Sequence, residues 1–254
     1  MTVEVHVLAS GSDGNCTVVK YDDRAVVIDA GLSGKKLMSL MDLNGLDKDC
    51  IESILITHEH SDHISGAGIL ARKLDVPVMC NERTFNASNL GNVKYSPVSM
   101  MNPFEVAGMK VMALPTSHDA AEPCSYFLDA DGFKVLIATD TGMITYPVEH
   151  ALEEADIALI ESNYDKRMLD EGPYPISLKR HIDSNLGHMC NVATGEVLKR
   201  TIDGNPHRKI FLAHLSRHNN EPDIARETVS KITGIKRFQI DCLEYKGDTR
   251  IMHD

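Results

Sequence analysis

The sequence lacks several features that would decide its class at once. It has no Trp, only 5% aromatic residues, no low-complexity run and no internal repeat. No apolar stretch approaches the roughly 20 residues that a membrane-spanning helix needs, so no membrane association is expected. The first 15 residues, MTVEVHVLASGSDGN, lack the basic segment and apolar run of a signal peptide. Six cysteines occur without any CxxC pair, which argues against a zinc knuckle and favours a cytoplasmic protein with free thiols.

The charge balance is acidic, with 37 Asp and Glu against 26 Lys and Arg and a formal net charge of −11. An acidic protein repels nucleic acid at long range, which argues mildly against a nucleic-acid partner. That argument does not exclude DNA, because bound divalent cations reverse the field locally. Basic residues also gather late in the chain, at 179–180, 199–200 and 208–209.

The pattern of apolar residues predicts an α+β fold. Alternating or short apolar segments predict strands at 3–9, 17–21, 25–29, 51–57, 76–80, 104–106, 109–114, 125–130, 134–139, 157–161, 210–213 and 237–243. Helical spacing predicts helices at 33–43, 64–74, 148–155, 177–185, 193–201 and 222–232. Because the early hairpins are antiparallel, two packed mixed sheets with outer helices fit better than one doubly wound sheet. The length of 254 residues suits a single domain, 1–254.

The sharpest local signal is the segment HEHSDH at 58–63, between an apolar strand and a helix. Its side chains His58, His60, Asp62 and His63 are of the kinds that bind borderline divalent metals. A turn can aim alternate residues at two neighbouring points, so one ion could take the first two histidines and another could take Asp62 and His63. The alternative is a solvated polar turn that happens to be rich in histidine.

Four more strand ends carry a possible metal ligand or a supporting carboxylate. Asp29, His118, Asp140 and His214 each follow an apolar segment. Any one of them alone is more often a surface or hydrogen-bonded residue than a ligand. Five such strand ends along one rim of the sheets would converge on one pocket.

With these motifs the sequence resembles the metallo-β-lactamase superfamily, because HEHSDH matches its HxHxDH signature and the four strand ends follow in order. The resemblance implies a four-layer αββα sandwich with the site at one edge between the sheets. The match is closer to the WalJ (YycJ) family, and it is carried by these segments: LASGSDGNC, VVIDAGLSGKKL, THEHSDHISG, ATDTG, ESNYD, GPYP, SLKRHIDSNLGHMCN and LAHLSRHNNEP. That family is associated with 5′-to-3′ exonuclease action on DNA and with an essential two-component regulator of the cell wall.

The chain departs from the family pattern at GHMCN, where GHLSN is expected, and at His181, where an Arg is expected. A β-CASP insert, as in related RNA nucleases, does not fit into 254 residues.

The resemblance also implies roles for individual residues. His58, His60 and His118 would hold one metal, Asp62, His63 and His214 a second, and Asp140 would bridge the two. Asp29 would orient the HEHSDH turn from outside the ligand set, as such carboxylates do. The set contains nitrogen and oxygen donors only, which suits Zn²⁺, Mn²⁺ or Fe²⁺ and does not choose among them.

Further residues are candidates for catalysis and substrate binding. Asp62 and His188 are the catalytic candidates, with His188 binding a phosphate oxygen or protonating the leaving alkoxide; the alternative for His188 is a helix-capping role. Lys179 and Arg180 are candidates for contacts to backbone phosphates, or else belong to a solvated helix face. Ser12 and Asn163 lie in polar loops after strands and either face the substrate or simply form turns.

These interpretations favour a metal-dependent phosphodiesterase, a 5′-to-3′ DNA exonuclease in which a hydroxide between two metals attacks phosphorus. A second hypothesis is hydrolysis of thioesters or lactones of the glyoxalase II kind, for which the basic residues and His188 would be dispensable. A third is a non-enzymatic partner in cell-wall signalling with a vestigial metal site. An intact set of seven candidate ligands argues against the third hypothesis, because a binding role needs no such set.

Overall fold

Two β-sheets of seven strands each form the centre of the computed structural model, which describes residues 2–243 and 249–253. The first sheet has the strand order β14-β1-β2-β3-β4-β5-β6 and the second β13-β12-β11-β10-β9-β8-β7. The strands of the first sheet are β1 (Val3–Ala9), β2 (Cys16–Tyr21), β3 (Arg24–Ile28), β4 (Ile51–Leu55), β5 (Val78–Cys80), β6 (Tyr95–Pro97) and β14 (Thr249–His253). Those of the second sheet are β7 (Phe104–Val106), β8 (Met109–Pro115), β9 (Cys124–Ala130), β10 (Phe133–Ala138), β11 (Ile157–Glu161), β12 (Lys209–Ala213) and β13 (Ile240–Cys242).

Each sheet is mixed, with an antiparallel half and a parallel half. In the first sheet, β14, β1, β2 and β3 pair antiparallel, and β3, β4, β5 and β6 pair parallel. In the second sheet, β7 to β10 pair antiparallel, and β10, β11, β12 and β13 pair parallel. The carboxyl ends of the parallel strands therefore lie along one edge of each sheet, and the loops that follow them can meet there.

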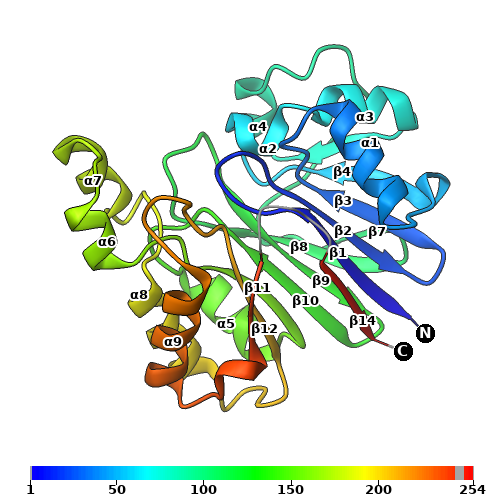
Figure 1. Ribbon diagram of the computed structural model, residues 1–254. Helices are drawn as coiled ribbons and strands as arrows, with labels where there is room; N and C mark the ends of the chain where they lie inside the picture. The colour runs from blue at the N-terminus through cyan, green and yellow to red at the C-terminus, as the bar shows by residue number, and fades with distance from the viewer. Residues whose placement is uncertain (1, 244–248, 254) are drawn as a thin grey trace.

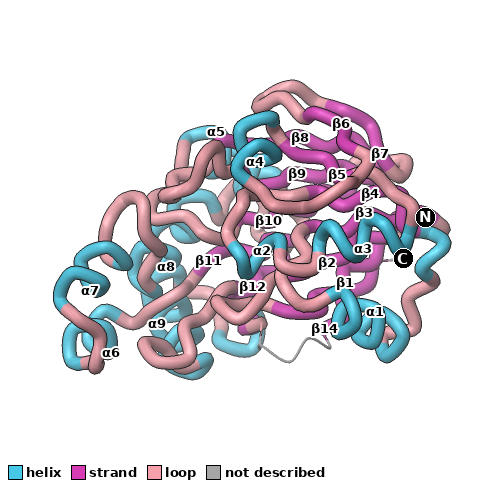
Figure 2. Tube along the Cα trace, turned by 90° about the horizontal axis from the view of Figure 1, so that it is seen from above, coloured by secondary structure: helices cyan, strands magenta, loops and turns pink. Residues whose placement is uncertain are grey.

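Helices cover the outer face of each sheet (Figure 1). The helices and 3-10 turns are α1 (Gly34–Leu43), η1 (Lys48–Cys50), α2 (Ser61–Ile64), α3 (Ala67–Leu74), α4 (Glu82–Ala87), α5 (Tyr146–Glu154), α6 (Lys166–Glu171), α7 (Ile176–Ile182), α8 (Asn191–Thr201), α9 (Pro222–Thr233) and η2 (Arg237–Gln239). α1 and α3 lie against the first sheet and α5, α8 and α9 against the second, while α6 and α7 project beyond α8 and α9 in both views (Figures 1 and 2).

Three apolar cores separate the four layers, and side-chain alternation along the strands explains them. In β3, Val26 and Ile28 face the core between the two sheets, while Ala25 and Val27 face the core under α1 and α3. Successive residues of a strand point to opposite faces, so a strand that is buried on both faces needs apolar residues throughout. A third core lies between the second sheet and its helices. The predicted α+β sandwich of two mixed sheets is confirmed.

Most predicted elements lie where the sequence pattern predicted them, and the differences concern one helix, one strand and several short elements. The single helix predicted at 64–74 is two helices, α2 and α3, broken at Gly66, where a Cβ atom would come within 2.0 Å of the Leu32 carbonyl oxygen. The strand predicted at 237–243 begins as the 3-10 turn η2 and becomes β13 only at Ile240. Short elements such as β6, α4, α6 and β14 were not predicted. In the described part of the chain, no helix is long and apolar enough to span a membrane.

Candidate metal centre

Asp29 fixes the turn that carries the HEHSDH segment. β4 ends at Leu55 and α2 begins at Ser61, so His58 and His60 lie in the connecting turn. Asp29 accepts hydrogen bonds from the Thr57 amide (2.9 Å), the Thr57 hydroxyl (2.8 Å) and His63 Nδ1 (2.7 Å). A buried carboxylate with three donors locks both the backbone and one imidazole of the turn. The structure therefore brings Asp29 into hydrogen-bonding contact with the turn that carries the predicted ligands.

Three of the strand-end residues adopt a backbone conformation that is rare for residues other than glycine. The φ angles of Asp29, Asp140 and His214 are 58°, 54° and 55°. They follow the ends of β3, β10 and β12 by one or two residues. Left-handed conformations of such residues cost free energy and cluster at functional sites, where the surrounding structure imposes them. Each sharp bend marks a strand end at the candidate centre.

The side chains predicted as ligands form two groups that meet at Asp140. In the first, His60 Nδ1 lies 3.1 Å from His58 Nε2 and 3.3 Å from His118 Nε2. The second consists of Asp62, His63, Asp140 and His214, whose possible ligand atoms lie within 4.8 Å of one another. One oxygen of Asp140 is 3.1 Å from His63 Nε2, and the other is 3.9 Å from His118 Nε2. All seven predicted ligands are thus brought together, with Asp140 between the groups.

Hydrogen bonds at Nδ1 orient three of the histidines so that Nε2 faces the centre. His63 Nδ1 donates to Asp29, His118 Nδ1 to the Gly187 carbonyl (3.0 Å) and His214 Nδ1 to Glu161 (3.0 Å). A donor at Nδ1 fixes the neutral tautomer with a lone pair on Nε2, the arrangement that histidine ligands to metals adopt. The structure thus aims three Nε2 atoms, which bind a cation once they are deprotonated, into one space.

The polar atoms of the centre are better suited to binding divalent cations than to hydrogen bonding with one another. His214 Nε2 is buried and makes no hydrogen bond within the described residues, and Asp140 Oδ2, also buried, has only the imidazole nitrogen of His63 at 3.1 Å. A buried polar atom without a partner costs about 1–3 kcal/mol, and a coordinated cation would satisfy both atoms. Imidazole and carboxylate without thiolate are donors that suit Zn²⁺, Mn²⁺ and Fe²⁺. The residues present therefore form a metal-binding centre in chemistry as well as in geometry.

The charge distribution of the centre also favours cations. Burial alone would raise the pKa of Asp140, but His214 and His63 outweigh burial and hold the pKa well below its usual range. Burial lowers the pKa of His58, and the neighbouring His63 lowers it further. Burial would also lower the pKa of His214, but the Asp140 carboxylate outweighs it and raises that pKa to about 10. The carboxylate is therefore ionised, and an entering cation would displace protons from the imidazoles.

Glu161, which the sequence analysis did not identify, is the carboxylate behind the centre. It ends β11 and is fully buried. Its Oε1 accepts from His188 Nδ1 (2.8 Å) and His214 Nδ1 (3.0 Å), and its Oε2 accepts from the Thr141 amide (2.8 Å). The sequence signal that could have identified Glu161 is its position directly after the apolar run IALI. A glutamate buried at the end of such a strand needs polar partners, so it indicates a site.

The structure places the remaining predicted residues at different distances from the centre. His188 lies at its edge, with ring centroids 5.3 Å from those of both His118 and His214 and a side chain that is 20% exposed. Asn163 is buried and its amide donates to the His214 carbonyl (2.8 Å), which indicates a positioning role for this predicted substrate-binding residue. Lys179 donates to the Asp170 carbonyl (2.7 Å) on α6, and Arg180 is exposed on α7.

The loop after α7 is anchored to the centre, which explains how His188 is held. The Asp119 amide donates to the Leu186 carbonyl (3.1 Å), and the Asp119 carboxylate pairs with His181 (3.0 Å). The departure from the family pattern at His181 therefore lies on the connection between α7 and the loop of His118.

The chain is similar to known proteins both in sequence and in fold. A family model described as "Beta-lactamase superfamily domain" matches residues 24–214. The chain is 40% identical to an "Exodeoxyribonuclease YycJ" of Bacillus anthracis, covering 100% of this chain and 96% of that one. It is also 40% identical to an "Exodeoxyribonuclease WalJ" of Streptococcus pneumoniae, covering 88% and 85%. The crystal structure of the metallo-β-lactamase fold protein YhfI from Bacillus subtilis has a TM-score of 0.76 at 15% identity and covers 99% of each chain, which shows the fold. The chain therefore belongs to the beta-lactamase superfamily of metal-dependent hydrolases and, within it, to the YycJ/WalJ family.

Proposed function

We propose that this protein is a phosphodiesterase that uses two divalent cations to remove nucleotides from the 5′ end of DNA. The observation that carries the proposal is a metal centre joined to an imidazole–carboxylate pair, His188 and Glu161, at its open edge. The names of the relatives, exodeoxyribonuclease at 40% identity over nearly the whole of both chains, support DNA as the substrate. All six cysteines are free thiols, which together with a DNA substrate supports a cytoplasmic location.

In this proposal each cation has its own histidines. His58, His60 and His118 would hold one, and Asp62, His63 and His214 the other. Asp140 lies between the groups, with Oδ2 3.1 Å from His63 Nε2 and Oδ1 3.6 Å from His214 Nε2 and 3.9 Å from His118 Nε2. When bound, such cations polarise phosphoryl oxygens and lower the pKa of water. The side chain of Asp62 is more accessible than that of Asp140, at 21% exposure against 4%, so we assign to Asp62 the orientation of the attacking water.

His188 and Glu161 would act on the leaving group. Because His188 Nδ1 is held by Glu161 Oε1, its Nε2 is the atom left to carry a proton toward substrate. A sugar alkoxide leaves poorly unless it is protonated, so a phosphodiester of DNA needs this donor. A thioester does not, because a thiolate is a much weaker base. The pair therefore favours phosphodiester cleavage over the thioester hydrolysis that the sequence also allowed, whereas a lactone, which also expels an alkoxide, is distinguished by the DNA assay.

The test is metal analysis of the purified protein together with assays on 5′-phosphorylated duplex DNA and on an acyl thioester. We expect two equivalents of Zn²⁺, Mn²⁺ or Fe²⁺ and release of mononucleotides from the 5′ end. Asp140→Asn should lose metal and activity, and His188→Ala should keep metal and lose DNA cleavage. His150→Ala, which changes an exposed histidine on α5, is the matched control.

Three results would overturn the proposal in different ways. Thioester cleavage without DNA cleavage would support the glyoxalase II-like alternative. Bound metal with neither activity would support a binding role in signalling. One equivalent of metal at full activity would refute the two-cation centre alone.

A further inference from the structure

A pocket of about 240 Å³ adjoins the metal centre on the side of His214. It is lined by Gly11, Ser12, Asp13, Tyr174, Leu215, Ser216, Arg217 and His218. One of its walls, residues 215–218, directly follows His214 of the centre, and the other, residues 11–13, follows Ser10. The Ser10 hydroxyl accepts a hydrogen bond from the His214 amide (2.9 Å), so the two walls are joined where they leave the centre.

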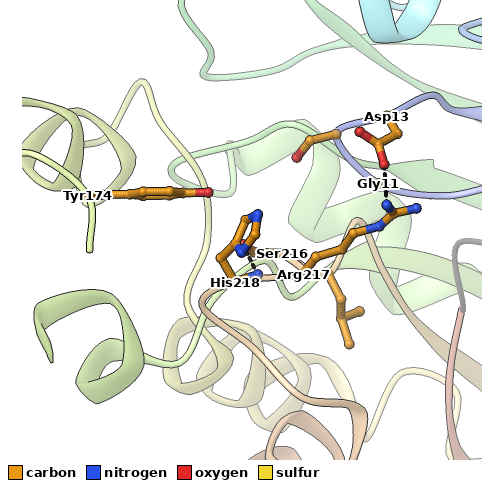
Figure 3. A pocket seen from close by; sticks show the side chains of 8 residues that line it. Gly11, Asp13, Tyr174, Ser216, Arg217 and His218 are labelled. Carbon is orange, nitrogen blue, oxygen red and sulfur yellow. Dashed lines mark hydrogen bonds and ion pairs between the residues drawn. The ribbon is translucent and has the colours of Figure 1, made fainter. Parts of the chain in front are cut away.

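The walls offer flat rings and hydrogen-bonding groups with balanced charge. Figure 3 shows Tyr174 reaching into the pocket from one side and the Asp13–Arg217 pair closing the other. That ion pair is 2.6 Å long, and the rings of Tyr174 and His218 meet edge to face with centroids 6.0 Å apart. Because the Asp13 carboxylate offsets the guanidinium, the pocket is a poor site for a phosphate. A nucleobase fits this chemistry, since its face stacks on an aromatic ring and its edge exchanges hydrogen bonds.

The size of the pocket selects a single unit of substrate. Its volume is below the roughly 300–1,000 Å³ typical of pockets for drug-sized ligands, so it has room for one nucleoside and not for a longer stretch of DNA. We propose that it receives the terminal nucleoside of the DNA strand, with the base against Tyr174, while the adjoining phosphodiester lies at the metal centre. This inference rests on the exonuclease function proposed above, and it assigns Ser12 to the wall of a base pocket.

The first experiment removes the ring from the protein and the base from the substrate in turn. Tyr174→Leu keeps an apolar side chain against Tyr164, Leu169 and Ile182 and loses the aromatic ring with its hydroxyl, whereas Tyr174→Phe loses the hydroxyl alone. We expect the wild-type protein to favour a normal 5′-terminal nucleotide over an abasic one by about 5- to 150-fold in kcat/KM, the usual range for stacking of one base. Tyr174→Leu should lose that preference, because it should cleave normal DNA more slowly and abasic DNA at the wild-type rate. Tyr174→Phe and the matched control Phe238→Leu, at an exposed aromatic residue in η2, should keep it.

Hydrolysis of bis(p-nitrophenyl) phosphate, which has no base, separates this inference from the proposed function. Its rate should be the same in all variants. A loss in Tyr174→Leu that is equal on normal and abasic DNA, or no preference in the wild-type protein, would overturn the pocket assignment. Cleavage of the small diester with no nucleotide released from DNA would instead refute the exonuclease function.

A binding measurement tests the pocket without catalysis. DNA with 2-aminopurine at its 5′ end is mixed with protein treated with EDTA. Stacking on Tyr174 should quench the fluorescence, and the quenching should be lost in Tyr174→Leu and kept in Tyr174→Phe. Absent quenching in the wild-type protein, or full quenching in Tyr174→Leu, would contradict the inference.

Discussion

Replacement of Glu161 by Gln is the sharpest perturbation of this centre, because it keeps the shape of the side chain and removes the charge. The carboxylate accepts from both His188 and His214 through the same oxygen, Oε1. Loss of an outer carboxylate behind a histidine ligand typically lowers metal affinity by about 10- to 100-fold. Loss of an aligned proton donor typically lowers the rate by about 10²- to 10⁴-fold. We therefore expect Glu161→Gln to show both effects on DNA.

The two effects can be separated by the leaving group. Cleavage of DNA requires a protonated sugar oxygen, whereas p-nitrophenolate leaves from bis(p-nitrophenyl) phosphate without a proton. At saturating metal, kcat on DNA should fall by about 10²-fold or more, and kcat on the small diester should fall by less than about 10-fold. The control is Glu82→Gln, an exposed glutamate of α4. Equal losses on the two substrates would refute the assignment of the His188–Glu161 pair to the leaving group.

Three further predictions concern stability and reactivity. Removal of metal by EDTA should lower the Tm by roughly 5–10 °C in a thermal scan, since a ligand at 100 times its Kd stabilises by about 2.7 kcal/mol; an unchanged Tm would contradict a structural contribution from the cations. Gly31→Ala should lower the free energy of unfolding in urea by more than about 3 kcal/mol, because its Cβ would lie 1.6 Å from the Asp62 carbonyl oxygen, whereas Gly45→Ala, which meets nothing within 4 Å, should cost only about 1 kcal/mol. Burial raises the pKa of the thiols of Cys16, Cys80 and Cys124, in the case of Cys80 to about 12. These thiols should therefore stay protonated at pH 8 and react with Ellman's reagent only after unfolding. Rapid labelling of any of them in the native protein would contradict their burial.

The residues of the centre were predictable where the chain concentrates unusual chemistry at a strand end. HEHSDH places four possible metal ligands within six residues, and Asp29, Asp140 and His214 each follow the end of an apolar strand. Convergence followed from topology, because carboxyl ends of parallel strands share an edge. Glu161 also ends a strand, but a single glutamate carries no pattern of its own. Its role depends on partners 27 and 53 residues away, which only the three-dimensional arrangement reveals.

Secondary structure was likewise predictable where a local sequence pattern is long enough to be recognised. Long apolar strands such as β1 and β11 have bounds that the sequence alone determines. The three-residue strand β6 and the six-residue helices α4 and α6 are too short for a period to show. The break at Gly66 depends on the close approach of Leu32, a contact between segments 34 residues apart along the chain. Tertiary contacts decide such elements, and no local pattern encodes them.

The centre unites the two sheets, and this has a consequence for how cations act on the molecule. The turn of His58 and His60 and the helix α2 with Asp62 follow β4 of the first sheet, while Asp140 and His214 follow β10 and β12 of the second. A cation with ligands from both sheets would hold these segments together with few direct polar contacts between them. Each ligand atom would then bind the cation, where otherwise the buried lone pairs repel one another. The same cations that activate a substrate would therefore clamp the edges of the sandwich. Metal occupancy should consequently alter hydrogen exchange at the 57–63 turn and at 140–142 together, although these segments belong to different sheets.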